Sequence, residues 1–168
     1  LWKIPIFHSL GILYTNFTNF LGFKDFEEGK TMALASYGMD TYKNLFQTII
    51  ELQPKGRYRI TDQKKYLALW SYMNGQLEKE LGKKRNENEP LEQRHFDIAH
   101  SMQNRIKEAI LHMLHHVAAS SGNKNLALSG GIFLNCDINK EINLHSGYEQ
   151  IFIPPFASDT GGAVGAGL

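Results

Sequence analysis

Two short apolar runs near the C-terminus, separated by the length of one helix, constrain the fold more than any other feature. Residues 126–128 and 150–153 predict buried strands, and residues 133–143 between them predict a helix. Strands joined through a helix run parallel with a right-handed connection, so the loops after both strands emerge at one edge of the sheet. We therefore predict a βαβ unit.

Both loops at that edge are rich in glycine. Gly130 and Gly131 follow the first predicted strand, and the sequence from Asp159 to Gly162 follows the second. Each loop leads into a predicted helix start, where unpaired N–H groups and the positive end of the helix dipole favour an anion. We expect the two turns to face one crevice.

The rest of the chain predicts mainly helices, at residues 10–23, 28–38, 42–52 and 92–120. A brief strand is predicted at residues 57–60, followed by a helix-like run to Gly82 that Thr61 or Asp62 can cap. The longest helix should bury one face and end at Gly122, and that face is formed by Ile98, Met102, Ile106, Ile110, Met113 and Val117. These elements fit the second lobe of a layered α/β domain.

Composition excludes several classes of protein. The 168 residues, 42% of them hydrophobic, suffice for one soluble globular core. A net charge of +1 does not favour nucleic acid, and the basic residues 83–85 lie in a loop with compensating acids. No apolar run could span a membrane, and a single cysteine, Cys136, fits a reducing compartment. We expect a cytoplasmic protein.

The two ends of the sequence predict that it is part of a longer chain. Residue 1 is not Met, and residues 161–168 look like the first turns of a small-residue helix. We expect part of any active site to lie outside it.

The Gly130-Gly131 pair is the first candidate for chemistry. Phosphate oxygens reach backbone N–H groups most closely where no Cβ intervenes, and glycine also adopts positive φ at low cost. The Asn135 amide, one turn later, can point toward the same ligand. The alternative is a tight turn followed by a surface Asn.

Asp159 is the only carboxylate of the second turn. It can hold a metal ion or a magnesium-bound phosphate, orient a ribose hydroxyl, or act as a base. An Asp before Thr-Gly-Gly-Ala is equally typical of a helix N-cap.

Other polar residues carry weaker patterns. His112 and His116 have the spacing of two metal ligands on one helix, but they flank the apolar face and are interpreted as packing or solvated residues. Lys30 can reach a phosphate or lie free on the surface. Cys136, without a base, is interpreted as a small packing residue.

Five segments together resemble the carbamoyltransferases of the nodulation and antibiotic-tailoring type. They occur in order at residues 9–14, 21–23, 28–38, 128–135 and 158–166. The resemblance covers nearly the whole chain, although residues 54–90 contribute little to it.

This resemblance implies a large domain of the actin/hexokinase/Hsp70 type, related to ribonuclease H, with a mixed sheet. The chain would be its C-terminal half, without the family's paired metal histidines, which lie N-terminal to it, and without the adenylating domain. The implied reaction moves a carbamoyl group from carbamoyl phosphate and ATP, through carbamoyl-adenylate, to a hydroxyl of a small molecule. An iron-type metal, and magnesium with ATP, are the implied cofactors.

The resemblance also implies roles for individual residues. Gly130, Gly131 and Gly161 would contact the adenylate, Asn135 would support them, and Asp159 would be a metal ligand. Lys30 would line the nucleotide side. Two other functions stay open: a carbohydrate kinase of the same fold class, and a nucleotide-binding module without catalysis.

Overall fold

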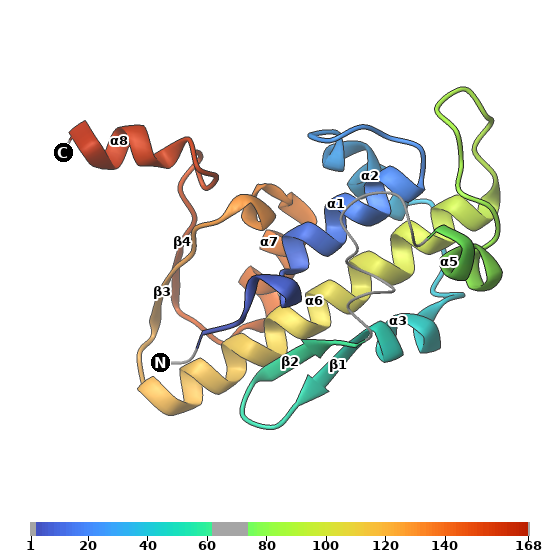
Figure 1. The fold of residues 1–168 in the computed structure, drawn as a ribbon. Coiled ribbons are helices and arrows are strands. Elements are labelled where there is room, and N and C mark those ends of the chain that lie inside the picture. Colours follow the sequence, from blue (N-terminus) through green and yellow to red (C-terminus); the bar gives the residue numbers. More distant parts are fainter. Residues whose placement is uncertain (1–2, 62–73, 168) are drawn as a thin grey trace.

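A single long helix, α6 (Gln93–Ser121), runs through the middle of the molecule, and most of the other elements pack around it (Figure 1). The structure is a computed structural model that describes residues 3–61 and 74–167. Ile98, Met102 and Ile106 are fully buried on the predicted face. The helix ends where Gly122 takes φ 66°, a left-handed conformation that suits glycine. The prediction for residues 92–120 is thus confirmed, although Val117 is exposed.

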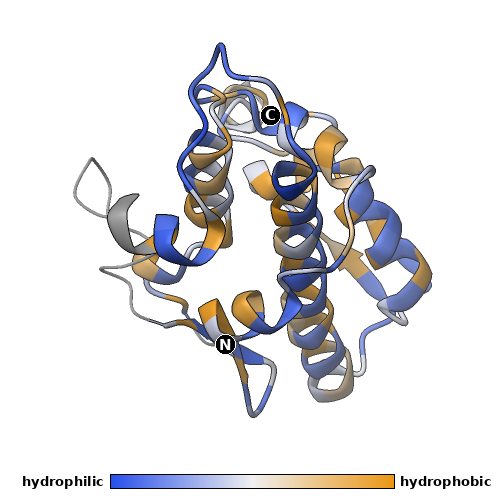
Figure 2. Ribbon diagram, turned by 90° about the vertical axis from the view of Figure 1, so that its right-hand side faces the viewer, coloured by the Kyte–Doolittle hydropathy of each residue, from blue (hydrophilic) through white to orange (hydrophobic). Residues whose placement is uncertain are grey.

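The described part of the chain consists of helices and two small sheets. In chain order they are η1 (Ile6–His8), α1 (Leu10–Phe20), α2 (Glu28–Ala35), α3 (Lys43–Ile49), β1 (Ile50–Gln53), β2 (Arg57–Ile60), α5 (Asn74–Leu81), α6, β3 (Asn125–Ala127), η2 (Gly131–Leu134), α7 (Cys136–His145), β4 (Gln150–Phe152) and α8 (Gly161–Gly167). Hydrophobic and hydrophilic residues alternate along the helices, as amphipathic packing requires (Figure 2). No helix of the described part is long and apolar enough to cross a membrane.

Helices α1 and α2 confirm the predictions for residues 10–23 and 28–38. The Phe17 ring of α1 lies 5.0 Å from the Phe46 ring of α3, in the centre of the core. The fully buried hydroxyls of Thr18 and Thr31 join α1 to α2 at 3.0 Å. Two buried hydroxyls that satisfy each other can lie in an apolar interface at little cost.

The helix predicted over residues 42–52 is wrong after residue 49. The chain turns into β1, which pairs antiparallel with β2 from Ile50 opposite Ile60 to Gln53 opposite Arg57. The Arg105 guanidinium binds the Ile50 carbonyl through Nε at 2.8 Å and Nη2 at 2.5 Å. A continued α3 would pair that carbonyl with the N–H of residue 54, but Pro54 has none, so the carbonyl takes its donors from α6. Local helical periodicity yields here to tertiary contacts.

The expected mixed sheet is also wrong for the described residues. They form two separate sheets, antiparallel β1–β2 and parallel β3–β4. The βαβ unit itself is confirmed, with Leu126 opposite Ile151 and α7 between the strands. The strand at residues 57–60 is confirmed as β2, and the run before Gly82 ends in α5. The Asp62 cap lies outside the described residues.

Thr61, the other expected cap, has a different partner. Its hydroxyl donates to the Thr48 carbonyl, and its backbone N–H donates to the Ile49 carbonyl at 2.9 Å. Thr61 therefore continues the contact between β2 and the end of α3.

Gly38 sets how closely the loop after α2 approaches α6. A Cβ on Gly38 would lie 2.1 Å from the Phe96 carbonyl oxygen, whereas a Cβ on Gly29 would meet nothing within 4 Å. We predict that Gly38→Ala lowers the free energy of unfolding by at least ~2 kcal/mol, because the backbone of α6 cannot retreat. Gly29→Ala in α2 should instead be neutral or stabilise by up to ~1 kcal/mol. Urea denaturation of both variants measures the difference, and equal stabilities would contradict this packing.

Candidate functional site

The loops after β3 and β4 meet at one edge, as predicted. The Ala157 carbonyl accepts hydrogen bonds from the Gly130 N–H at 2.6 Å and from the Ser129 hydroxyl at 3.2 Å. Ala157 is itself only 1% exposed. The segment before Asp159 is therefore tied directly to the glycine turn.

The glycine turn is open on its outer side. Gly130 has φ 124° and ψ 149°, a conformation that L side chains rarely adopt. A Cβ on Gly131 would meet nothing within 4 Å. The N–H groups of Gly131 and Ile132 open η2 and have no acceptor within that helix. They are the donors that an anion at this turn would meet first.

Gly161 permits a tight return of the second loop. A Cβ at this position would lie 2.7 Å from the Phe156 carbonyl oxygen. The close packing of the loop therefore already requires a glycine at this position. Its contact with adenylate stays a prediction. Helix α8, which begins here, extends away from the other elements (Figure 1).

Asp159 is exposed, and its carboxylate makes no hydrogen bond within the described part of the chain. The Gly162 N–H binds the Asp159 backbone carbonyl at 3.0 Å instead of the side chain. The carboxylate is therefore not used as a cap and is free to bind a cation.

The described residues fit a metal ion only as one part of its ligand set. Within residues 3–61 and 74–167, no group of three His, Cys, Asp or Glu side chains could hold a metal. Asp159 can supply one hard oxygen ligand. Any further ligands would come from outside these residues.

Asn135 lies between η2 and α7 and has every polar position filled. Its Oδ1 accepts from the Ile138 N–H at 3.1 Å and from Gln103 Nε2 at 3.0 Å. Its Nδ2 donates to Gln103 Oε1 at 3.0 Å and to the Tyr14 hydroxyl at 3.3 Å. Asn135 is therefore the N-cap of α7 and part of a buried network, and an additional contact with a ligand would compete with these bonds.

The chain matches the family described as "Carbamoyltransferase N-terminus" over residues 1–168. It belongs to this family. It is 35% identical to an uncharacterised protein of Synechocystis and 35% identical to "Nodulation protein NolO" of Bradyrhizobium diazoefficiens, in each case over 99% of this chain. It is 36% identical over 98% of its length to "Nodulation protein NolNO" of Sinorhizobium fredii. The chain spans 28%, 29% and 23% of these relatives, respectively.

Other predicted residues of this carbamoyltransferase-family chain lie apart from the glycine turn. Lys30 pairs with Glu27 at 2.6 Å on the surface, with its ammonium 5.7 Å from the Phe23 ring centre. Its role toward a nucleotide stays a prediction. Cys136 is exposed, so its interpretation as a packing residue is wrong, although its sulfur lies 3.7 Å from Met32 Sδ.

His112 and His116 are both partly buried, in line with their interpretation as packing or solvated residues, and each has its own partner. His112 Nε2 lies 2.7 Å from the Gln53 carbonyl oxygen, and His116 Nε2 lies 3.4 Å from the Ser120 hydroxyl. The i, i+4 spacing therefore does not make them a metal pair here.

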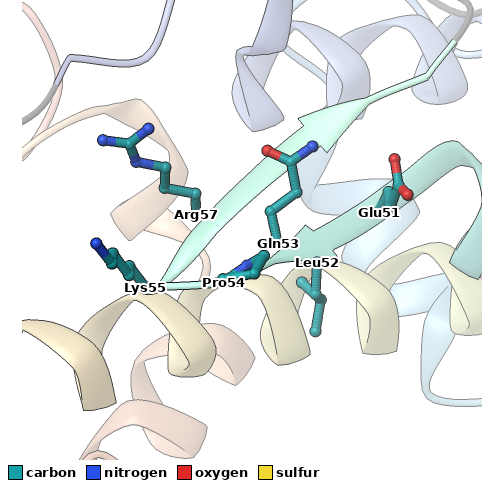
Figure 3. A pocket seen from close by; sticks show the side chains of 6 residues that line it. All are labelled: Glu51, Leu52, Gln53, Pro54, Lys55 and Arg57. Carbon is teal, nitrogen blue, oxygen red and sulfur yellow. The ribbon is translucent and has the colours of Figure 1, made fainter.

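A hollow of about 430 Å³ lies on the β1–β2 hairpin, away from the glycine turn (Figure 3). It is lined by Glu51, Leu52, Gln53, Pro54, Lys55 and Arg57. None of the predicted site residues contributes to it.

The residues missed by sequence reasoning are those that support Asn135. Gln103 Nε2 also donates to Asp137 Oδ2 at 3.0 Å, which Lys107 Nζ binds at 3.0 Å. Burial raises the pKa of Tyr14, so its hydroxyl stays protonated and donates to Gln103 Oε1 at 2.9 Å. The only sequence signal was a Gln next to the apolar face of the longest helix.

Asp137 makes the network sensitive to acid. Burial opposes its ionisation, but hydrogen bonds from Gln103 and Lys107 outweigh burial and lower its pKa below the ordinary 3.8. Its stabilising contribution is therefore complete above pH 3.8 and is lost as pH falls through the lowered folded-state pKa. We predict that Asp137→Asn removes this part of the pH dependence, whereas the parts that come from other carboxylates with lowered pKa values remain, namely Asp97, Glu27, Glu89 and Glu92. Urea unfolding between about pH 2 and 7 tests it, and identical pH profiles of the two proteins would contradict it.

Proposed function

We propose that the protein containing this chain is an ATP-dependent O-carbamoyltransferase. It would transfer the carbamoyl group of carbamoyl phosphate, through carbamoyl-adenylate, to a hydroxyl of a small molecule such as a sugar or a nodulation or antibiotic precursor. The observation that carries the proposal is the junction of the glycine turn with the Asp159 loop through Ala157, in a chain that matches the family throughout. The names of two relatives, both nodulation proteins, support this acceptor class.

The glycine turn would bind the phosphate of the adenylate. The N–H groups of Gly131 and Ile132 have no acceptor within η2, and the space beside Gly131 is open. Such donors stabilise charge on a departing phosphate. The acceptor oxygen forms a bond to the carbamoyl carbon, the bond from that carbon to the AMP phosphate oxygen breaks, and the hydroxyl proton passes to solvent water. Holding the hydroxyl near the carbonyl supplies a further rate gain.

Asn135 and Gly161 would act mainly through the backbone that they shape. Four internal hydrogen bonds favour a supporting role for Asn135 over direct contact with the nucleotide. Lys30 would line the nucleotide side only after leaving its pair with Glu27.

Asp159 would hold the divalent metal, of iron type, with further ligands from outside the described residues. Such an ion, when bound, polarises an oxygen at which negative charge develops. Magnesium would accompany ATP. Asp159 itself contributes an exposed carboxylate in the loop that is tied to the glycine turn, and its negative charge would attract a cation.

We predict that full-length protein given carbamoyl phosphate, ATP and a hydroxyl acceptor converts ATP to AMP and pyrophosphate and yields a carbamoylated product. Chromatography with mass detection measures both. Formation of ADP and a phosphorylated acceptor would indicate a carbohydrate kinase instead. ATP binding without turnover of any acceptor would favour a non-catalytic module.

We predict that Asp159→Ala abolishes transfer and lowers the metal content of full-length protein, since an exposed ligand is removed without disturbing a buried contact. Asp25→Ala is the matched control, because Asp25 is also exposed but binds Asn19 Nδ2 at 2.9 Å. Elemental analysis of the purified variants gives a readout independent of activity. Unchanged metal content in Asp159→Ala would reject Asp159 as a ligand.

A further inference from the structure

We propose that Gln103 is a positioning residue for the phosphate-binding glycine turn. The identity of the bound ligand rests on the proposed function, but the mechanical link rests on contacts alone. Gln103 lies in α6, far from the turn in sequence, and among the described residues its hydrogen bonds reach the turn through Asn135.

Gln103, like Asn135, uses every polar position of its side-chain amide. It is 1% exposed. Its Oε1 accepts from the Tyr14 hydroxyl and from Asn135 Nδ2, and its Nε2 donates to Asn135 Oδ1 and Asp137 Oδ2. These four bonds use the whole capacity of the amide, so its orientation has no alternative. A rotation of the amide would place donor against donor and acceptor against acceptor.

The orientation of Gln103 fixes Asn135, and Asn135 fixes the turn. Asn135 is both the residue that ends η2 and the residue that caps α7. Its N–H donates to the Ile132 carbonyl at 3.2 Å, while its Oδ1 accepts from the Ile138 N–H at 3.1 Å. Moving its side chain would therefore shift η2, whose first two N–H groups belong to Gly131 and Ile132.

The network is anchored in two helices of the core. Tyr14 belongs to α1 and is 5% exposed, and Gln103 belongs to the central helix. Lys107, one turn further along α6, holds the Asp137 carboxylate on the outer side. The short η2 helix thus takes its position from two long helices through a single bidentate amide pair.

The test uses full-length protein and AMP, the expected leaving product, as the probe. Gln103→Leu keeps a similar volume and removes all four hydrogen bonds. We expect it to raise the inhibition constant of AMP in the transfer assay by about tenfold or more, because the N–H groups of the turn no longer hold one position. An inhibition constant does not depend on the fraction of protein that is folded, so loss of stability alone would leave it unchanged.

Ser101→Ala is the matched control. Ser101 lies two residues earlier on α6 and is equally buried, but its hydroxyl binds the Tyr42 N–H at 3.0 Å, at the loop before α3. We expect Ser101→Ala to lower thermal stability and to leave the AMP constant within about twofold. If Gln103→Leu does not fold, Tyr14→Phe, which removes one hydroxyl from the same network, should raise the AMP constant by a smaller factor.

The outcomes separate the two proposals. Suppose that the unsubstituted protein makes AMP and product. If the inhibition constant of AMP is then unchanged in Gln103→Leu, or in Tyr14→Phe where Gln103→Leu does not fold, the positioning role is overturned and the proposed function is left intact. Equal increases in Gln103→Leu and Ser101→Ala also overturn it, since the effect would then be general. Unsubstituted protein that makes neither AMP nor product overturns the proposed function and, with it, this inference.

Discussion

Burial of one face of α6 is the contact on which the rest of the molecule depends. Ile98, Met102, Ile106 and Ile110 are at most 1% exposed, and α1, α2, α3 and the hairpin surround the helix that carries them. Removing that much apolar surface from water is the main favourable term available to a chain of this size. Helices as short as α2 and α3 would not persist alone, so their stability derives from α6.

The same helix also fixes the positions of neighbouring segments through buried polar residues. Asp97 binds the Met39 N–H and the Thr41 hydroxyl, and Ser101 binds the Tyr42 N–H. Further along, Gln103 holds Asn135, and Arg105 holds the Ile50 carbonyl. Each polar group fixes a different loop or strand at a defined position along α6. Apolar packing alone would tolerate small slides of these segments, whereas satisfied buried hydrogen bonds penalise them.

Sequence periodicity predicts the elements that depend on local interactions alone. The stripe of α6, its end at Gly122 and the βαβ unit follow from spacing and turn chemistry. The boundary between α3 and β1 does not, because it depends on Arg105, more than fifty residues away. The sequence places Asn135 after the glycine turn, but its partners Tyr14 and Gln103 come from distant helices, and no local pattern pairs them.

The two loops need their glycines for different physical reasons. Gly130 is required by its backbone conformation, and Gly161 is required by the close Phe156 carbonyl. Gly131 has neither a positive φ nor a neighbour within 4 Å of a Cβ, so the fold of the described chain would accept a side chain there. Its openness leaves space beside the turn that another group could occupy. In the proposed function, the hydrogen bonds around Asn135 would hold the N–H groups beside this opening in place, and binding of a small anion benefits from both fixed donors and open access.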